Sequence, residues 1–127
     1  MNGNDRSPED ALRELEPQAF AIRGQPARTF DRLPVVGRVA PAFCLADADF
    51  KDWTLADFCG KKKILTVVSS LDRPVCHPSA KQFNEEVAAR ADVVVLTISA
   101  DLPFAQARFC ATLTAPNGTF LSTFRSP

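Results

Sequence analysis

Two continuous apolar runs dominate the second half of the sequence, Ile64–Val68 and Val93–Ile98. Neither run alternates with polar residues, and both are rich in β-branched side chains. This pattern is typical of strands that are buried on both faces in a parallel sheet. Phe120–Phe124 predicts a third strand near the end of the sequence. The pattern therefore predicts a central sheet built mainly from the second half of the chain.

Between these strands the apolar spacing becomes helical. Ser79–Ala91 has one apolar stripe, and Leu102–Leu113 follows the second strand with Asp101 as its expected N-cap and Pro103 in its first turn. The residues of the stripe are Ala80, Phe83, Val87 and Ala91. The order strand, helix, strand, helix, strand implies right-handed crossovers and a parallel sheet of the α/β class.

The first half of the chain has weaker signals. Phe20–Ile22 and Arg28–Phe30 flank Gly24–Pro26, which predicts a small β-hairpin. Three short elements are expected after it: a strand at Phe43–Leu45, a polar turn at Asp47–Asp49, and one helical turn at Thr54–Phe58 closed by Gly60. Residues 1–17 are polar and are interpreted as a flexible N-terminal arm, which leaves residues 18–127 as one domain.

Composition agrees with one folded domain. The chain has 127 residues, of which 46% are hydrophobic and 24% charged. Fifteen basic residues balance fifteen acidic ones, so neither nucleic acid nor an anionic membrane is an expected partner. No apolar run approaches the ~18 residues of a membrane span, and Met1–Glu16 lacks the apolar core of a secretory signal. A cytoplasmic location is therefore expected.

The four cysteines are scattered along the chain at Cys44, Cys59, Cys76 and Cys110. In a reducing compartment such cysteines do not form a static disulfide scaffold. No pair has C-x-x-C spacing, and the lone histidine, His77, adjoins Cys76. This spacing argues against a zinc site, so no metal or other cofactor is expected.

Cys76 has the most distinctive position. Ligands of open α/β sheets bind beyond the carboxyl ends of the strands, and Cys76 follows the first predicted strand just as a helix begins. The free N–H groups of a helix N-terminus stabilise a thiolate, which is the nucleophilic form of cysteine. Arg73 adds a positive charge three residues earlier. These grounds alone leave a reactive and a structural role for Cys76 equally open.

Three segments carry a resemblance to a known family. Asp72–Glu86 resembles the thiol peroxidase active-site segment, D-T-x-V-C followed by a helix with K-F-N. Ser99–Cys110 is nearly the signature around the resolving cysteine of that family, and Leu121–Arg125 is similar to the segment that follows it. The resemblance extends from about Phe20 to Arg125. It identifies the chain as similar to the atypical 2-Cys peroxiredoxins, which have a thioredoxin-like fold.

The resemblance implies a mechanism and partners. The Cys76 thiolate attacks hydrogen peroxide or an organic hydroperoxide and becomes a sulfenic acid. Cys110 condenses with it to a disulfide, which thioredoxin reduces by thiol exchange. The resemblance also implies a homodimer. Cys44 and Cys59 match no redox position of the family and are interpreted as structural.

The chain also departs from the family. The pattern P-x-x-x-T/S-x-x-C would place a proline at Ser69 and a hydroxyl side chain at Arg73. Arg73 supplies charge and is the one candidate substrate-binding or activating residue, but it cannot accept a hydrogen bond. Family members continue beyond the segment that ends at Arg125, so a thioredoxin-like fold that is incomplete at the C-terminus is expected.

These departures leave three functional hypotheses open. The first is an enzyme, a thioredoxin-dependent thiol peroxidase. The second is a non-catalytic remnant of a peroxiredoxin. The third is a slow thiol redox sensor that forms the Cys76–Cys110 disulfide without rapid turnover.

Overall fold

The structure is a computed structural model that describes residues 17–29, 32–113 and 118–126. It divides into two compact units, Met1–Pro41 and Ala42–Pro127. The predicted arm over residues 1–17 lies outside the described residues except for Pro17. In the described part of the chain, no helix is both long enough and apolar enough to cross a membrane.

The first unit contains the predicted hairpin, formed by β1 (Ala19–Ile22) and β2 (Gln25–Arg28) in antiparallel pairing. Arg23 and Gly24 form the turn, with φ of 50° and 78°. Positive φ at both turn positions matches the twist of the two strands. The turn therefore begins one residue before the predicted Gly24–Pro26 segment, and Gln25 and Pro26 belong to β2.

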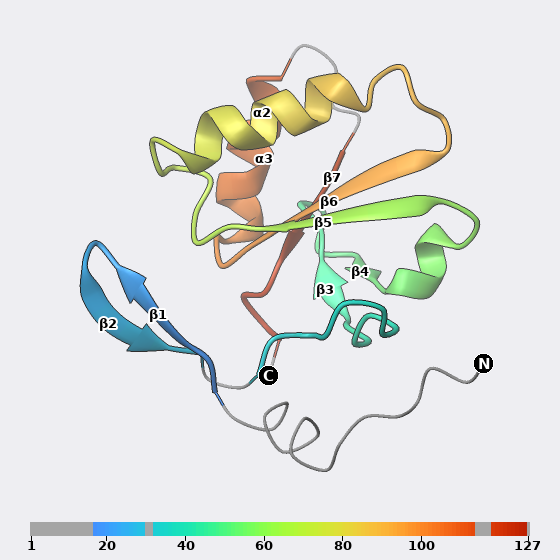
Figure 1. Cartoon of the computed structure of the whole chain (residues 1–127). Helices are drawn as coiled ribbons and strands as arrows, with labels where there is room; N and C mark the ends of the chain where they lie inside the picture. The colour runs from blue at the N-terminus through green and yellow to red at the C-terminus, as the bar shows by residue number, and fades with distance from the viewer. Residues whose placement is uncertain (1–16, 30–31, 114–117, 127) are drawn as a thin grey trace, which may run out of the picture. The chain divides into compact units, whose positions relative to one another are not determined.

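The second unit is built on a five-stranded mixed sheet in the order β4-β3-β7-β6-β5. The strands are β3 (Leu45–Ala46), β4 (Asp52–Trp53), β5 (Lys62–Val67), β6 (Val93–Ser99) and β7 (Thr119–Ser122). β5, β6 and β7 are parallel, as the sequence predicts, whereas β3 is antiparallel to both β4 and β7. Two α-helices, α2 (Cys76–Glu86) and α3 (Pro103–Ala111), lie on one side of this sheet, as Figure 1 shows.

Two apolar clusters occupy the two faces of the sheet. On the helix side, Phe120 of β7 packs with residues of α2, α3 and the segments beside them: Leu71, Ala80, Phe109 and Leu113. On the other side, alternate residues of β6 pack with β3, β7 and the 3₁₀ helix η1 (Leu55–Phe58). The residues of that second cluster are Leu45, Phe58, Val94, Leu96, Ile98 and Leu121. β6 is thus the buried central strand that the apolar run predicts.

β5 differs from the prediction. Its apolar run predicts burial on both faces, but in the sheet formed by the described residues β5 lies at the edge. Ile64 and Leu65 are each 39% exposed and Val67 is 74% exposed. An apolar run indicates a strand, but it does not show how many neighbours cover that strand.

α2 begins earlier than the predicted Ser79. It starts at Cys76 and ends at Glu86. Ala80 and Val87 of the predicted stripe are buried, but Phe83 is 37% exposed. Asn84 is buried instead, where its Oδ1 accepts a hydrogen bond from the Gly118 N–H at 3.0 Å. α2 also ends before the predicted Ala91, and its buried face includes Asn84 as well as Ala80.

Candidate active site

Cys76 is the first residue of α2 and follows the carboxyl end of β5. Its thiol is free and partly buried. The His77 N–H donates to the Arg73 carbonyl at 3.0 Å, which adds a turn before the helix proper. The N–H groups on both sides of Pro78 have partners one turn back, since the Ser79 N–H also donates to the Val75 carbonyl, at 3.4 Å. Pro78 has no N–H, so it omits the one bond between these two, and Cys76 stays inside the helix.

Arg73 and Ser69, the two departures from the family pattern, contact each other. The Arg73 guanidinium donates to Ser69 Oγ at 3.1 Å. Among the described residues, this is the hydrogen bond that the structure gives the guanidinium, in place of one to the Cys76 thiol. Both side chains are exposed. The structure thus places Arg73 in the loop before Cys76 and ties it to Ser69.

Asp101 joins that loop to the sheet. One carboxylate oxygen accepts from Ser70 Oγ at 2.7 Å, and the other accepts from the Leu71 N–H at 2.7 Å and from Ser99 Oγ at 2.8 Å. The carbonyl of Asp101 also accepts a hydrogen bond from the Ser122 hydroxyl. This single residue thus connects the loop after β5 to the ends of β6 and β7.

This role corrects the predicted one. The N-cap of α3 is Leu102 rather than Asp101, and it makes no side-chain capping bond. The carboxylate turns toward the neighbouring loop because the carboxyl ends of β5 and β6 lie side by side. A signal for this was present in the sequence, since polar residues follow both strands at the same edge of a parallel sheet.

Hydrogen bonding keeps the Asp101 carboxylate ionised. Partial burial opposes ionisation, but the hydrogen bonds donated by the Leu71 backbone and by the Ser70 and Ser99 hydroxyls outweigh it. The pKa of Asp101 therefore lies below its ordinary value of 3.8.

Cys110 lies in the last turn of α3, partly buried beside the apolar cluster of the helix side. Burial raises the pKa of its thiol above the ordinary value of 9.0, and a hydrogen bond from its own backbone offsets only part of that rise. A thiol in this environment is protonated at neutral pH.

The two cysteine-bearing helices meet next to the cysteines. The ring of His77 packs edge-on against the ring of Phe109, with 4.8 Å between their centroids. His77 adjoins Cys76 and Phe109 adjoins Cys110. Both thiols are free. The contact brings the neighbours of the two predicted redox residues together, and each sulfur remains a separate thiol.

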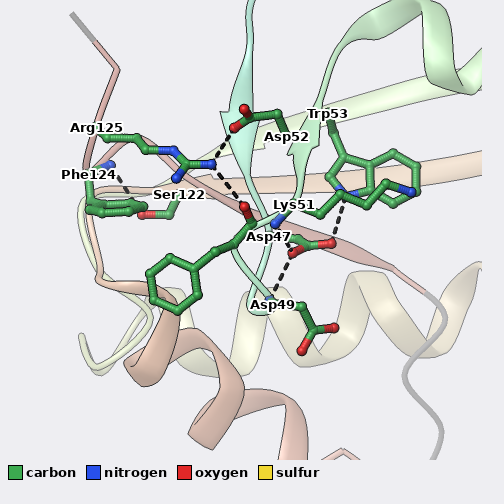
Figure 2. Close-up of polar contacts among 9 residues, drawn as sticks. Asp47, Asp49, Lys51, Asp52, Trp53, Ser122, Phe124 and Arg125 are labelled. Carbon is green, nitrogen blue, oxygen red and sulfur yellow. Dashed lines mark hydrogen bonds and ion pairs between the residues drawn. The ribbon is translucent and has the colours of Figure 1, made fainter.

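Cys110 also borders a shallow depression of about 250 Å³. Its lining includes Asp47, Trp53, Gly118 and Phe120. Asp47 closes the turn between β3 and β4 by accepting hydrogen bonds from the Asp49 and Lys51 N–H groups at 2.8 and 3.0 Å and from Trp53 Nε1 at 2.7 Å (Figure 2). This turn is the polar one predicted at Asp47–Asp49.

The same turn is tied to the segment after β7. Arg125 donates to Asp52 Oδ1 at 2.6 Å and to the Phe50 carbonyl at 2.9 Å, as Figure 2 shows. Burial opposes ionisation of Asp47, but the hydrogen bonds from Trp53, Lys51 and Asp49 outweigh it and lower its pKa below 3.8. Asp47 and Trp53, which line the depression, therefore belong to a hydrogen-bonded turn.

The remaining cysteines lie apart from this network. Cys44 and Cys59 are exposed free thiols. In the ranges that the structure describes, His, Cys, Asp and Glu side chains form no group of three that could hold a metal ion.

The fold agrees with what the chain is similar to. The Redoxin family model matches residues 35–124. This match covers well over half of the sequence, so the chain belongs to the redoxin family.

Within the redoxin family, the chain is similar to thiol peroxidases in sequence and to a peroxiredoxin-like protein in structure. The chain is 40% identical over 106 residues to the thiol peroxidases of two strains of Vibrio cholerae serotype O1. That alignment covers 84% of this chain, and the chain spans 65% of the length of these curated relatives. A peroxiredoxin-like protein from Aquifex aeolicus has a TM-score of 0.74 at 33% identity, over 85% of this chain and 63% of its own.

A thiol peroxidase from Chromobacterium violaceum shows the same fold, with a TM-score of 0.66 at 24% identity over 73% of this chain and 54% of its own. The predicted thioredoxin-like fold of the peroxiredoxins is confirmed by these likenesses.

Proposed function

We propose that this chain reduces hydrogen peroxide or organic hydroperoxides, with Cys76 as the attacking thiol. The observation that carries the proposal is the 40% identity to thiol peroxidases over 106 residues, in a chain whose Cys76 begins a helix at the carboxyl end of a parallel strand. Such a position suits a nucleophilic thiolate.

The proposed chemistry has two steps on the protein. The Cys76 thiolate attacks one oxygen of the hydroperoxide, the O–O bond breaks, and the other oxygen leaves as an alkoxide or hydroxide that takes up a proton. Cys76 is then a sulfenic acid, oxidised by two electrons. Cys110 next attacks the Cys76 sulfur, an S–S bond forms, and the hydroxyl leaves as water.

Thioredoxin is the proposed reductant. One of its thiolates attacks the Cys76–Cys110 disulfide, and its second thiol releases the mixed disulfide, which restores both thiols of this chain. A cytoplasmic location fits this reductant, since the cytosol keeps thioredoxin reduced. Arg73 is the proposed activating residue, through its positive charge in the loop before Cys76.

The test is peroxide consumption coupled to thioredoxin and its reductase. We expect turnover from the wild type and none from Cys76→Ser. Cys59→Ser is the matched control, because Cys59 is an exposed free thiol outside the site, and it should turn over at the wild-type rate. Wild-type turnover that persists in Cys76→Ser would refute the assignment of the nucleophile.

One observation favours a slow redox sensor as a second candidate. Burial raises the pKa of Cys110, so little of the resolving thiolate is present at neutral pH. Disulfide formation would then be slow even if the attack by Cys76 is fast. Stoichiometric oxidation of Cys76 without sustained turnover would support this sensor, and no peroxide reaction at all would support a non-catalytic remnant.

A further inference from the structure

A chain of hydrogen bonds connects α3 to the loop that leads to Cys76. It starts at Gln106, which is fully buried in the middle of α3. The Gln106 Nε2 donates to Ser99 Oγ at 3.0 Å, and the Ser99 hydroxyl donates to the Asp101 carboxylate at 2.8 Å. Both Gln106 and Ser99 are buried, so water does not compete for these bonds. The helix that carries Cys110 is thereby joined to the carboxyl end of β6.

The same chain continues from Asp101 into residues 68–75, the loop between β5 and α2. The Ser70 hydroxyl donates to the Asp101 carboxylate at 2.7 Å, and Ser70 Oγ accepts from the Asp72 N–H at 3.1 Å. The Ser70 carbonyl also accepts from the Arg73 N–H, at 3.3 Å. Ser70 is therefore the residue through which Asp101 holds the turn that leads into α2.

Each hydroxyl of this chain has its orientation fixed. An ionised carboxylate only accepts hydrogen bonds, so Ser70 and Ser99 must both direct their protons at Asp101. Each hydroxyl oxygen then accepts from a donor behind it, the Asp72 N–H on one side and Gln106 Nε2 on the other. Because every donor is committed to one acceptor, a break at one end frees groups along the whole chain.

Packing alone does not account for an amide at Gln106. Its Oε1 is buried and has no hydrogen-bond partner among the described residues. An unpaired buried acceptor opposes folding, and an apolar side chain of similar volume would avoid that penalty. What the amide adds is its nitrogen, which donates to the Leu121 carbonyl at 2.9 Å as well as to Ser99. The contribution of Gln106 therefore lies in the connections that its nitrogen makes.

We propose that Gln106 is a positioning residue for the reaction at Cys76, acting through Ser99 and Asp101 on the loop of residues 68–75. The inference rests on the proposed function. Attack on a hydroperoxide requires the sulfur to line up with the O–O bond, and rates fall steeply when such an alignment is loosened. A residue on the helix of the proposed resolving cysteine thus also controls the first step, at the other cysteine.

A double-variant cycle with Gln106→Leu and Ser70→Ala tests the proposal, because these changes break the two ends of the chain. The readout is the second-order rate constant for loss of the Cys76 thiol with hydrogen peroxide, followed by quenching and mass spectrometry. We expect each single variant to slow this step by about tenfold or more. The double variant should be no slower than the slower single variant, since both changes interrupt one connection. Losses that multiply, or an unchanged rate in Gln106→Leu, would overturn the proposal.

Alkylation of Cys76 by iodoacetamide separates positioning from a general loss of stability. Alkylation needs no alignment with an O–O bond, so its rate should rise in both single variants as the partly buried thiol becomes more accessible. It should rise no further in the double variant, whereas a chain that only stabilises the fold would change neither rate in the folded protein. If the wild type does not react with peroxide, the proposed function fails, and the alkylation cycle decides this inference. Unchanged or multiplying alkylation rates would then overturn it.

Two further variants keep the test sound. Ser99→Ala breaks the same chain by removing one oxygen, and it replaces Gln106→Leu in the cycle, with the same expected result, if that variant fails to fold. Arg108→Gln is the matched control, because Arg108 is exposed on α3 two residues from Gln106, and it should leave both rates unchanged. A loss in Arg108→Gln as large as in Gln106→Leu would show that any change in α3 disturbs Cys76, which contradicts a specific role for Gln106.

Discussion

Asp101 is the residue on which the geometry of the Cys76 loop depends most directly. Its carboxylate accepts hydrogen bonds from the Ser70 hydroxyl and the Leu71 N–H, both in that loop, and from the Ser99 hydroxyl. An amide at this position offers one acceptor oxygen in place of two and adds an N–H group that needs its own acceptor.

We predict that Asp101→Asn destabilises the fold by about 1–3 kcal/mol at neutral pH, the usual effect of leaving a donor without its charged acceptor. The folded pKa of Asp101 lies below 3.8, so its stabilising contribution is present above that value and is lost as the pH falls through the folded pKa. Urea unfolding at about pH 7 and about pH 3 measures both effects.

The difference between wild type and Asp101→Asn should shrink at the lower pH. Asp72→Asn is the control, because Asp72 is an exposed carboxylate in the same loop. A difference that is equal at both pH values would show that ionisation of Asp101 contributes nothing to stability.

Cys110 gives a second prediction at the scale of one residue. Its pKa is raised above 9.0 by burial, so in a variant that keeps Cys110 alone, alkylation should still accelerate with pH above that value. The same variant unfolded in urea should reach its plateau at a lower pH, because water then surrounds the thiol. The measurement is the alkylation rate by mass spectrometry, and equal midpoints in the two states would contradict the effect of burial.

The sequence predicts the positions of some site residues but not their side-chain contacts. The position of Cys76 at a helix start follows from the apolar run before it and the helical spacing after it. The sequence shows that polar residues follow both strands, but it does not specify the bonds from Ser70 and Leu71 to Asp101. These bonds join residues 31 and 30 positions apart and depend on the lateral order of the strands. The interaction between Arg73 and Ser69 depends on side-chain orientations that no local pattern determines.

At the scale of elements, α3 is positioned by one buried amide. Gln106 is fully buried, and its Nε2 donates to Ser99 Oγ at 3.0 Å and to the Leu121 carbonyl at 2.9 Å. Its Oε1 has no hydrogen-bond partner among the described residues. The amide nitrogen thus ties α3 to β6 and β7.

We predict that Gln106→Leu destabilises the fold by about 1–3 kcal/mol, since it leaves the buried Leu121 carbonyl without its side-chain donor. Gln82→Leu is the matched control on the exposed side of α2 and should change the free energy of unfolding by less than about 0.5 kcal/mol. Chemical denaturation measures the free energy of unfolding of both variants. A loss in Gln106→Leu no larger than in the control would mean that the amide nitrogen is not required.

The elements also differ in how well the sequence predicts them. The β6 run predicts a buried central strand correctly, because β6 has β5 and β7 on its two sides and helices on one face. β5 also contains a β-branched apolar run but lies at the edge of the sheet that the described residues form, and strand order is a property of the whole sheet. Gly24 allows the hairpin to be predicted, but the turn begins at Arg23. Arg23 adopts a positive φ of 50°, which its residue type does not predict.

At the scale of the whole molecule, the proposed chemistry predicts a change in thiol number. The chain has four cysteines, all of them free thiols in the structure. Treatment with one equivalent of peroxide should leave two thiols, Cys44 and Cys59, as counted by alkylation after denaturation. Non-reducing peptide mapping should recover one Cys76–Cys110 disulfide.

A double variant, Cys44→Ser with Cys59→Ser, provides the control for this count. It should retain two thiols before oxidation and none afterwards. Recovery of Cys44 or Cys59 as the main disulfide partner of Cys76 would contradict the assignment of Cys110.

The two ends of α3 are anchored by different kinds of contact, so we expect one end to open more easily than the other. Its N-terminal end adjoins Asp101, whose carboxylate and carbonyl bind three segments of the second unit. Its last turn, which carries Cys110, is held by a local hydrogen bond from the Thr112 hydroxyl to the Phe109 carbonyl and by the apolar packing of Phe109 and Leu113. Helix ends open more cheaply than helix middles. We therefore expect the C-terminal turn of α3 to swing open first, which would free Cys110 to reach another sulfur while the sheet and the Cys76 loop stay in place.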